Sequence, residues 1–180
     1  MGTKVKKEKP LISPDWTPNR RRAVEEYIVE LQRILRLQDW NIKVDWTEPC
    51  DDISLATNDP LEDQKGATIR VSEKFLPLTS EEQTQTLVHE MIHCHLNVMT
   101  DLAEYAVKSL AKKEANEMFL IAFSQSLELT TDAIADAIAP MIKQFVLPEK
   151  EEILVVENKK GNLRNVNSNK RVAKKARSKK

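Results

Sequence analysis

Apolar residues recur at helical spacing in residues 18–37. They are three or four positions apart: Val24, Tyr27, Ile28, Leu31, Ile34 and Leu35. Pro18 stands near the start, where its fixed φ suits the first turn of a helix. The pattern therefore predicts an amphipathic helix of about five turns.

The pattern changes to a period of two at Trp40. Trp40, Ile42, Val44 and Trp46 alternate with polar residues, which predicts a strand with one buried face. Residues 48–66 are acidic and aperiodic, and we expect a loop there with at most a weak edge strand. A second strand is predicted from Ala67 to Phe75, ending near Pro77.

Helical periodicity returns after Thr79. Thr79 and Glu82 form a capping box, so a helix should begin there and run to about Met99. Residues 101–130 predict a further helical hairpin or long helix, which continues to Ala139 before Pro140. A last helical stretch is expected over residues 141–147. The expected fold class is α+β, with an N-terminal helix, a small sheet of two to four strands and a helical C-terminal part.

Composition limits the chain to one ordinary domain with appendages. Of its 180 residues, 41% are apolar and 31% are charged, and no apolar run approaches the roughly 20 residues that span a bilayer. We expect a flexible lead over residues 1–17, a domain over 18–148 and a basic, disordered tail over 149–180. The basic N-terminus precedes no apolar segment, and two cysteines make no disulfide framework. A cytoplasmic protein without a membrane partner is the expectation.

The zero net charge conceals a basic C-terminal tail. Residues 158–180 hold ten Lys and Arg and no acid, which leaves 18 basic against 28 acidic residues in the rest. Acidic protein does not attract nucleic acid, whereas a Lys-rich tail does. We expect residues 159–180 to offer at most a weak, salt-dependent nucleic-acid contact, because the tail has no aromatic residue for base stacking.

The predicted second helix contains an HExxH motif. His89 and His93 are four residues apart, so their imidazoles lie within about 40° of each other, one turn apart, and can hold one metal ion. Glu90 stands beside them, where it can reach a metal-bound water. Such a pattern arises by chance on the order of 0.005 times in a chain of this composition.

The third ligand must come from elsewhere. His95 lies about 200° from His93 around the helix and Cys94 about 100°, so neither completes the site while the helix stays regular. A downstream carboxylate is therefore expected. The candidates on helical segments are Asp101, Glu104, Glu114, Glu117, Glu128, Asp132 and Asp136.

A second motif narrows this choice. HExxH followed on a later helix by Glu128-Leu129-Thr130-Thr131-Asp132 resembles the gluzincin branch of zinc metallopeptidases. The resemblance implies that Glu128 is the third zinc ligand and that Asp132 hydrogen-bonds His89 or His93. Two features depart from that pattern: Leu127 stands where gluzincins often have Asn, and 35 residues separate His93 from Glu128. Glu117, which follows an Asn, remains the rival ligand, with Glu114 third.

The wider context, over about residues 25–145, is similar to small zincin-like metallopeptidases of phages and prophages. Its points of likeness are residues 37–40, 67–71 and 86–88, followed by the two motifs. The likeness implies a zincin-like fold and a Zn²⁺-dependent hydrolase that cleaves a protein or peptide substrate. We expect Glu90 to act as the general base. Tyr105 is the candidate transition-state donor, and the strand Ala67 to Phe75 is the candidate sheet edge for a peptide substrate.

A different class of function remains open. The chain can instead be an inactive metal-containing binding module that its basic tail recruits to nucleic acid. Glu90 favours the enzyme, because a structural site needs no carboxylate at that position.

Overall fold

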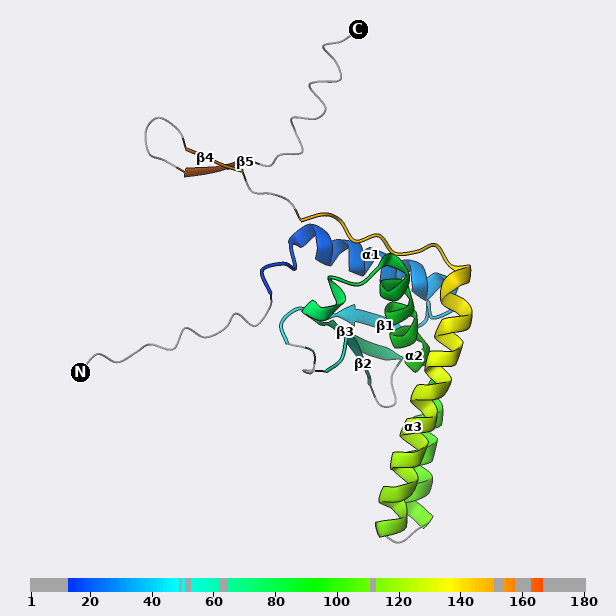
Figure 1. The fold of residues 1–180 in the computed structure, drawn as a ribbon. Helices are drawn as coiled ribbons and strands as arrows, with labels where there is room; N and C mark the ends of the chain where they lie inside the picture. The colour runs from blue at the N-terminus through cyan, green and yellow to red at the C-terminus, as the bar shows by residue number, and fades with distance from the viewer. Residues whose placement is uncertain are drawn as a thin grey trace, which may run out of the picture.

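The computed structural model describes residues 13–48, 50, 53–61, 65–110, 113–150, 154–157 and 163–166. They form an α+β structure in which three long helices accompany a small mixed sheet (Figure 1). The expected α+β class is thereby confirmed. None of the helices in these residues is long and apolar enough to cross a bilayer.

The first helix, α1, spans Pro18–Ile34. The Thr17 side chain caps it by accepting a hydrogen bond from the Arg20 backbone N–H, and Pro18 opens the first turn. Its buried face consists of Val24, Tyr27, Ile28 and Leu31. The predicted helix is confirmed, and it ends just before Arg36, whose φ of 60° is incompatible with a continuing right-handed helix.

The sheet contains β1 (Asn41–Val44), β2 (Ala56–Pro60) and β3 (Gly66–Val71) in the order β1-β3-β2. β1 pairs with β3 in parallel and β2 pairs with β3 antiparallel. The weak edge strand expected within residues 48–66 is present as β2. The second predicted strand is shorter than expected, because a single 3₁₀ turn, η1 (Glu73–Phe75), follows Val71.

The two faces of β3 have different surroundings. Ala67, Ile69 and Val71 are buried, and the core lies between them and apolar residues of α1 and α2. Arg70 lies on the opposite face of the sheet, where it pairs with Asp45, Glu48 and Asp59. The sheet is therefore covered by helices on one side and carries an ion-pair network on the other.

The second helix, α2, spans Ser80–Leu110. The capping box is confirmed: the Thr79 N–H donates to the Glu82 carboxylate, and the Glu82 N–H donates to the Thr79 hydroxyl. The predicted end near Met99 is wrong. No glycine or proline interrupts residues 80–110, so nothing in the local sequence stops the helix.

The third helix, α3, spans Lys113–Ile138 and folds back along α2 as a helical hairpin. The far ends of both helices extend beyond the sheet and α1 (Figure 1). Pro140 then lies in a single 3₁₀ turn, η2 (Ala139–Met141), and the helix predicted over residues 141–147 is wrong.

Residues 142–150 instead run back along α1 (Figure 1). Phe145 is buried in the core, and its N–H donates to the Thr84 hydroxyl over 2.8 Å. The Tyr27 hydroxyl donates to the Lys143 carbonyl and the Arg20 side chain to the Pro148 carbonyl. These contacts replace the hydrogen bonds that a helix would have made.

Residues outside the expected domain bounds of 18 and 148 also have described structure. Trp16, assigned to a flexible lead, is buried with its ring centroid 4.9 Å from that of Trp46. Beyond residue 150, the described residues form an antiparallel pair, β4 (Leu154–Glu157) with β5 (Leu163–Val166). Residues 13–17 and 149–150 are described as well, and the Lys150 side chain pairs with Asp15. The remaining residues of the predicted flexible lead and disordered tail lie outside the described residues.

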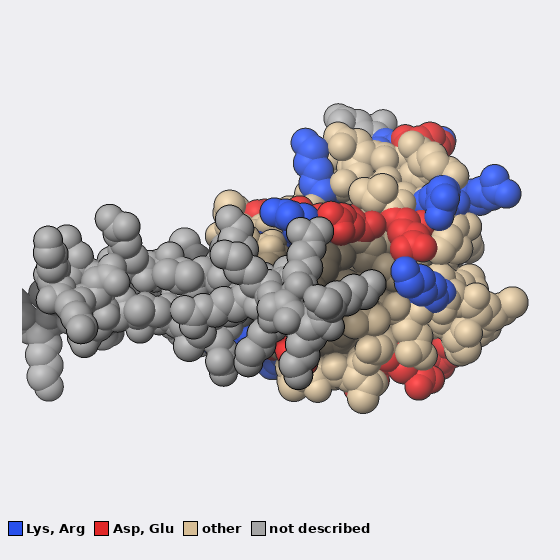
Figure 2. Space-filling view, turned by 90° about the horizontal axis from the view of Figure 1, so that it is seen from above, with Lys and Arg blue, Asp and Glu red and all other residues tan. Residues whose placement is uncertain are grey.

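Charged side chains are mixed on the surface seen from above in Figure 2. On the described part of that face, Lys and Arg side chains lie beside Asp and Glu side chains rather than gathering into one basic patch. The described surface on this side therefore offers no concentrated positive field of the kind that attracts nucleic acid.

Candidate metal centre

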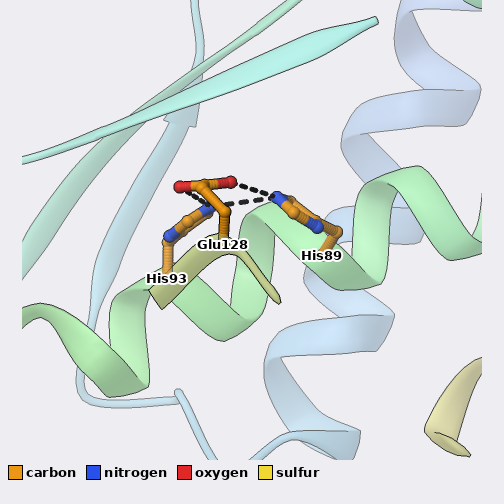
Figure 3. A group of neighbouring side chains, drawn as sticks. All are labelled: His89, His93 and Glu128. Carbon is orange, nitrogen blue, oxygen red and sulfur yellow. Dashed lines mark hydrogen bonds and ion pairs between the residues drawn. The ribbon is translucent and has the colours of Figure 1, made fainter. Parts of the chain in front are cut away.

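Three side chains from two helices converge on one point. His89 and His93 come from α2 and Glu128 comes from α3, and all three point toward one another (Figure 3). The two histidine Nε2 atoms are 3.0 Å apart. The Glu128 carboxylate oxygens lie 3.4 Å from Nε2 of His89 and 3.7 Å from Nε2 of His93.

The donor set and its dimensions fit a tetrahedral metal ion. Zinc ligands stand at about 2.0–2.2 Å from the ion, so their donor atoms are about 3.3–3.6 Å apart in a tetrahedron. The three observed separations lie close to that range. Two imidazoles and one carboxylate suit zinc among the common metals and leave one coordination position for water or substrate.

The antiparallel pairing of α2 and α3 determines which turn of α2 each carboxylate of α3 lies beside. Glu128, Asp132 and Asp136 follow one another at four-residue intervals and meet successive turns of α2. Glu128 lies beside His89 and His93, Asp132 beside His89, and Asp136 beside Gln85. Small residues between the helices allow this approach, since Thr131 and Ala135 are almost completely buried. The contacts form a regular ladder along the hairpin.

Asp132 determines how His89 can act. Its Oδ1 atom lies 2.8 Å from Nδ1 of His89. Because an ionised carboxylate only accepts hydrogen bonds, this contact favours the tautomer of neutral His89 that donates from Nδ1 and keeps a lone pair on Nε2. That Nε2 atom is the one directed at His93 and Glu128. The arrangement selects the tautomer that can bind a metal.

Burial favours the neutral, metal-binding form of His93. Removal from water lowers the pKa of His93 from its usual value of 6.5. The nearby Glu128 carboxylate acts in the opposite direction, while His89 adds to the lowering. The imidazole of His93 is therefore neutral at pH 7, which is the form that coordinates metals.

Glu90 is buried beside the two histidines. It lies about 60° around α2 from His93 and is only 6% exposed. Its backbone carbonyl accepts a hydrogen bond of 2.5 Å from the Asn58 side chain on β2. The same Asn58 nitrogen is 3.2 Å from the Cys94 sulfur. Asn58 therefore ties the strand β2 to the turn of α2 that carries the motif.

The two other residues near the motif face away from it. α2 is regular through His95, whose Nε2 atom lies 2.7 Å from the Leu35 carbonyl at the end of α1. Cys94 is buried, and this burial raises the pKa of its thiol, so the metal-binding thiolate is disfavoured. The exclusion of His95 and Cys94 as ligands requires a regular helix through His95, and α2 is regular there.

The other proposed site residues lie elsewhere. Glu117 is exposed and about 16 Å along α3 from Glu128, and Glu114 is a further turn away in the backbone. Tyr105 is 71% exposed on α2 and about 18 Å along the helix from His93. Of the three candidate third ligands, only Glu128 is brought to the histidines. Tyr105 is too distant to donate to a group reacting there.

Sequence reasoning missed Asn58 and the contact of Gln85 with Asp136. Asn58 stands in an aperiodic segment, where nothing distinguishes its side chain from those of neighbouring polar residues. Gln85 and Asp136 carry a signal, because each extends the four-residue spacing of its own motif by one turn.

Comparisons with known proteins add no relative. No protein-family model, no curated protein and no solved structure matches this chain.

Proposed function

We propose that this chain is a zinc-dependent metallopeptidase that hydrolyses peptide bonds, with Glu90 as its general base. The observation that carries the proposal is that the possible ligand atoms of His89, His93 and Glu128 all lie within 4.8 Å of one another. Three protein ligands with a fourth position left open are typical of catalytic zinc rather than of structural zinc. The Asp132 contact supports the same assignment, because catalytic histidine ligands are commonly oriented by a carboxylate.

The metal ligands, Glu90 and Asp132 have separate roles in the proposed reaction. Zinc held by His89, His93 and Glu128 would supply Lewis acidity, lowering the pKa of a water and polarising a carbonyl. Glu90 takes the proton of the attacking water and returns it to the amine that leaves when the peptide bond breaks. Glu90 is only 6% exposed, and Asp132 keeps His89 in the tautomer that the site requires.

The substrate path differs from the one that the sequence predicts. β3 is the middle strand with partners on both sides, so its backbone cannot accept a further strand. β2 is an edge strand of the sheet in the described part of the chain, and Asn58 joins it to α2 beside Glu90. We therefore assign β2 as the edge along which an extended peptide would add and pass the metal site.

The proposal is tested by incubating zinc-loaded protein with a mixed peptide library and detecting new N-termini by mass spectrometry. Glu90→Gln should keep its zinc and lose cleavage by about a hundredfold to ten-thousandfold, because only the base is removed. Glu117→Gln makes the same change at an exposed position and should leave cleavage intact.

Two results would overturn the peptidase assignment. One is the absence of cleavage by zinc-loaded wild type, and the other is equal cleavage by wild type and Glu90→Gln. Zinc binding without cleavage, together with salt-dependent DNA binding that is lost when residues 159–180 are deleted, is what the alternative binding module predicts.

A further inference from the structure

The two helices that hold the metal centre carry acidic residues without basic ones around it. Lys and Arg make up 28 of the 180 residues, yet none stands in residues 80–107 of α2 or 116–138 of α3. The same two stretches hold nine Asp and Glu. Within these helices the nearest Lys to a ligand is 15 residues away, Lys108 from His93 and Lys113 from Glu128, or about 22 Å along the helix. The helical surface around the centre is therefore negatively charged.

Asp101 and Glu104 lie on the side of α2 where the metal centre opens. β2 contacts α2 at Glu90, about 60° around the helix from His93. α3 contacts α2 at His89, about 40° from His93 on the other side. Asp101 and Glu104 lie about 80° and 20° from His93, on the side of Glu90. Both acids therefore continue the strip of α2 that runs between α3 and β2.

Asp136 lies beyond the other end of the ligand set. It contacts Gln85 of α2, which precedes both histidines, whereas Asp101 follows them. Asp136 is exposed and about 12 Å along α3 from Glu128. Asp101 is half-buried and about 12 Å along α2 from His93. The metal centre is thus flanked by a carboxylate at each end.

The two strands nearest the centre do not offset this charge. Arg70 is the one basic residue of β2 and β3, and it lies on the face of the sheet away from the helices. There it pairs with Asp45, Glu48 and Asp59. On the face toward α2, Asn58 is neutral. The positive charge of Arg70 is therefore compensated on the far side of the sheet.

We propose, on the basis of the function proposed above, that the metal centre cleaves peptides with Lys or Arg within about four residues of the bond that breaks. An extended peptide rises about 3.3 Å per residue, so the roughly 12 Å to Asp101 or Asp136 corresponds to three or four residues. A carboxylate has about four acceptor positions, so the contacts of Asp101 with Asn97 and of Asp136 with Gln85 do not prevent either acid from binding a cation.

A field of one sign selects among peptides before they reach the metal centre. Clefts lined by charges of one sign raise the association rate of oppositely charged ligands by about tenfold to a thousandfold. Acidic peptides are repelled by the same field. Salt screens charges that are separated by more than about 8 Å at physiological ionic strength. The preference for basic peptides should therefore be largest at low salt.

The proposal is tested with a peptide that the zinc-loaded full chain cleaves in the mixed library. The peptide is synthesised in three versions, with Lys, Gln or Glu at the third and fourth positions on each side of the cleaved bond. Wild type should give a kcat/KM for the Lys version about tenfold or more above that for the Glu version, with the Gln version between them. Added NaCl should reduce this ratio.

Two double variants with the same change of charge locate the preference. Asp101→Asn with Asp136→Asn should lower the Lys-to-Glu ratio of kcat/KM by about threefold or more, because both flanking carboxylates are lost. Glu26→Gln with Glu30→Gln also removes two acids, but from α1, which contributes no ligand. This pair should keep the ratio of wild type. Circular dichroism checks that both double variants are folded.

The outcomes separate this substrate class from the peptidase assignment. Equal cleavage of the three versions by wild type would overturn the preference for basic peptides and leave the peptidase standing. An equal fall of the ratio in both double variants would also overturn it, because net charge rather than Asp101 and Asp136 would then be the cause. Cleavage of no library peptide would overturn the proposed function and the substrate class together.

Discussion

Nδ1 of His89 lies 2.8 Å from Oδ1 of Asp132, across the contact between α2 and α3. The contact turns Nε2 of His89 toward His93 and Glu128. Asp132→Asn should therefore weaken zinc binding about tenfold to a hundredfold, because an amide no longer enforces the required tautomer. A competition titration against a zinc-binding dye measures this change. Asp136→Asn, one turn further along α3, is the matched control and should have a much smaller effect. Equal affinities of wild type and Asp132→Asn would contradict the role given to Asp132.

Zinc binding should weaken at acidic pH. Burial holds the pKa of His93 below 6.5, so zinc competes with few protons at pH 7 and with more as the pH falls through that lowered pKa. The zinc-free chain should show the same sign in its stability. Its unfolded form binds the proton at a higher pH than the native form, so stability is lost as the pH falls below 6.5. Zinc titrations and urea unfolding over a pH series test both statements. An affinity that rises on acidification would exclude His93 as a neutral ligand.

The close approach of α2 and α3 depends on a small residue at position 131. Thr131 is fully buried between the helices, so Thr131→Leu should lower the free energy of unfolding by about 1–3 kcal/mol through overpacking. Separation of the helices should also move Glu128 away from the histidines and weaken zinc binding. Thr130→Leu, at the exposed neighbouring position, should change neither quantity. Urea unfolding and zinc titration provide the two readouts, and equal effects of both variants would show that the spacing does not depend on Thr131.

The link between β2 and α2 should contribute measurably to stability. Asn58→Ala removes the donor to the Glu90 carbonyl and should lower the free energy of unfolding by about 1–2 kcal/mol. Thr57→Ala alters the adjacent residue of the same strand, whose side chain contacts Cys50 rather than α2, and leaves this link in place. Chemical denaturation of the zinc-free protein separates the link from metal binding. A cost no greater than that of Thr57→Ala would leave Asn58 without this role.

Local patterns were sufficient for part of the structure. The spacing of His89 and His93 on a helix requires no knowledge of the rest of the fold, and the Thr79–Glu82 capping box marks the helix start within a few residues. The strand β1 follows from a clear period of two. The capping box and the histidine pair involve residues within one helical turn of each other, and the alternation that identifies β1 is likewise local, although β1 pairs with the distant strand β3.

The choice among Glu114, Glu117 and Glu128 depends on where the hairpin turns. α2 ends at Leu110 and α3 begins at Lys113, so residues about equally far from that point lie opposite each other. His93 is then at the height of Glu128. A turn near Met99, as the sequence predicts, would have paired His93 with a much earlier residue. No glycine or proline marks the real turn, and only the family resemblance favoured Glu128.

The position of β3 also depends on distant contacts. Periodicity identifies β3 as a strand, but strand order is decided by which segments pair, and β2 contributes little periodic signal. For the same reason the sequence predicts the substrate edge at β3 rather than at β2. A helix that ends near Met99, as the sequence predicts, would leave Tyr105 free to fold back toward the site, whereas the continuous helix α2 carries it away from the histidines.

Metal content of the purified protein, measured by inductively coupled plasma mass spectrometry, tests the central claim most directly. Wild type and Glu117→Gln should each hold about one zinc per chain after exposure to zinc and desalting, whereas His89→Ala and Glu128→Gln should hold little. Circular dichroism of the same samples checks that each variant is folded. A wild type without zinc, or a Glu128→Gln variant that retains it while Glu117→Gln loses it, would contradict the proposed site.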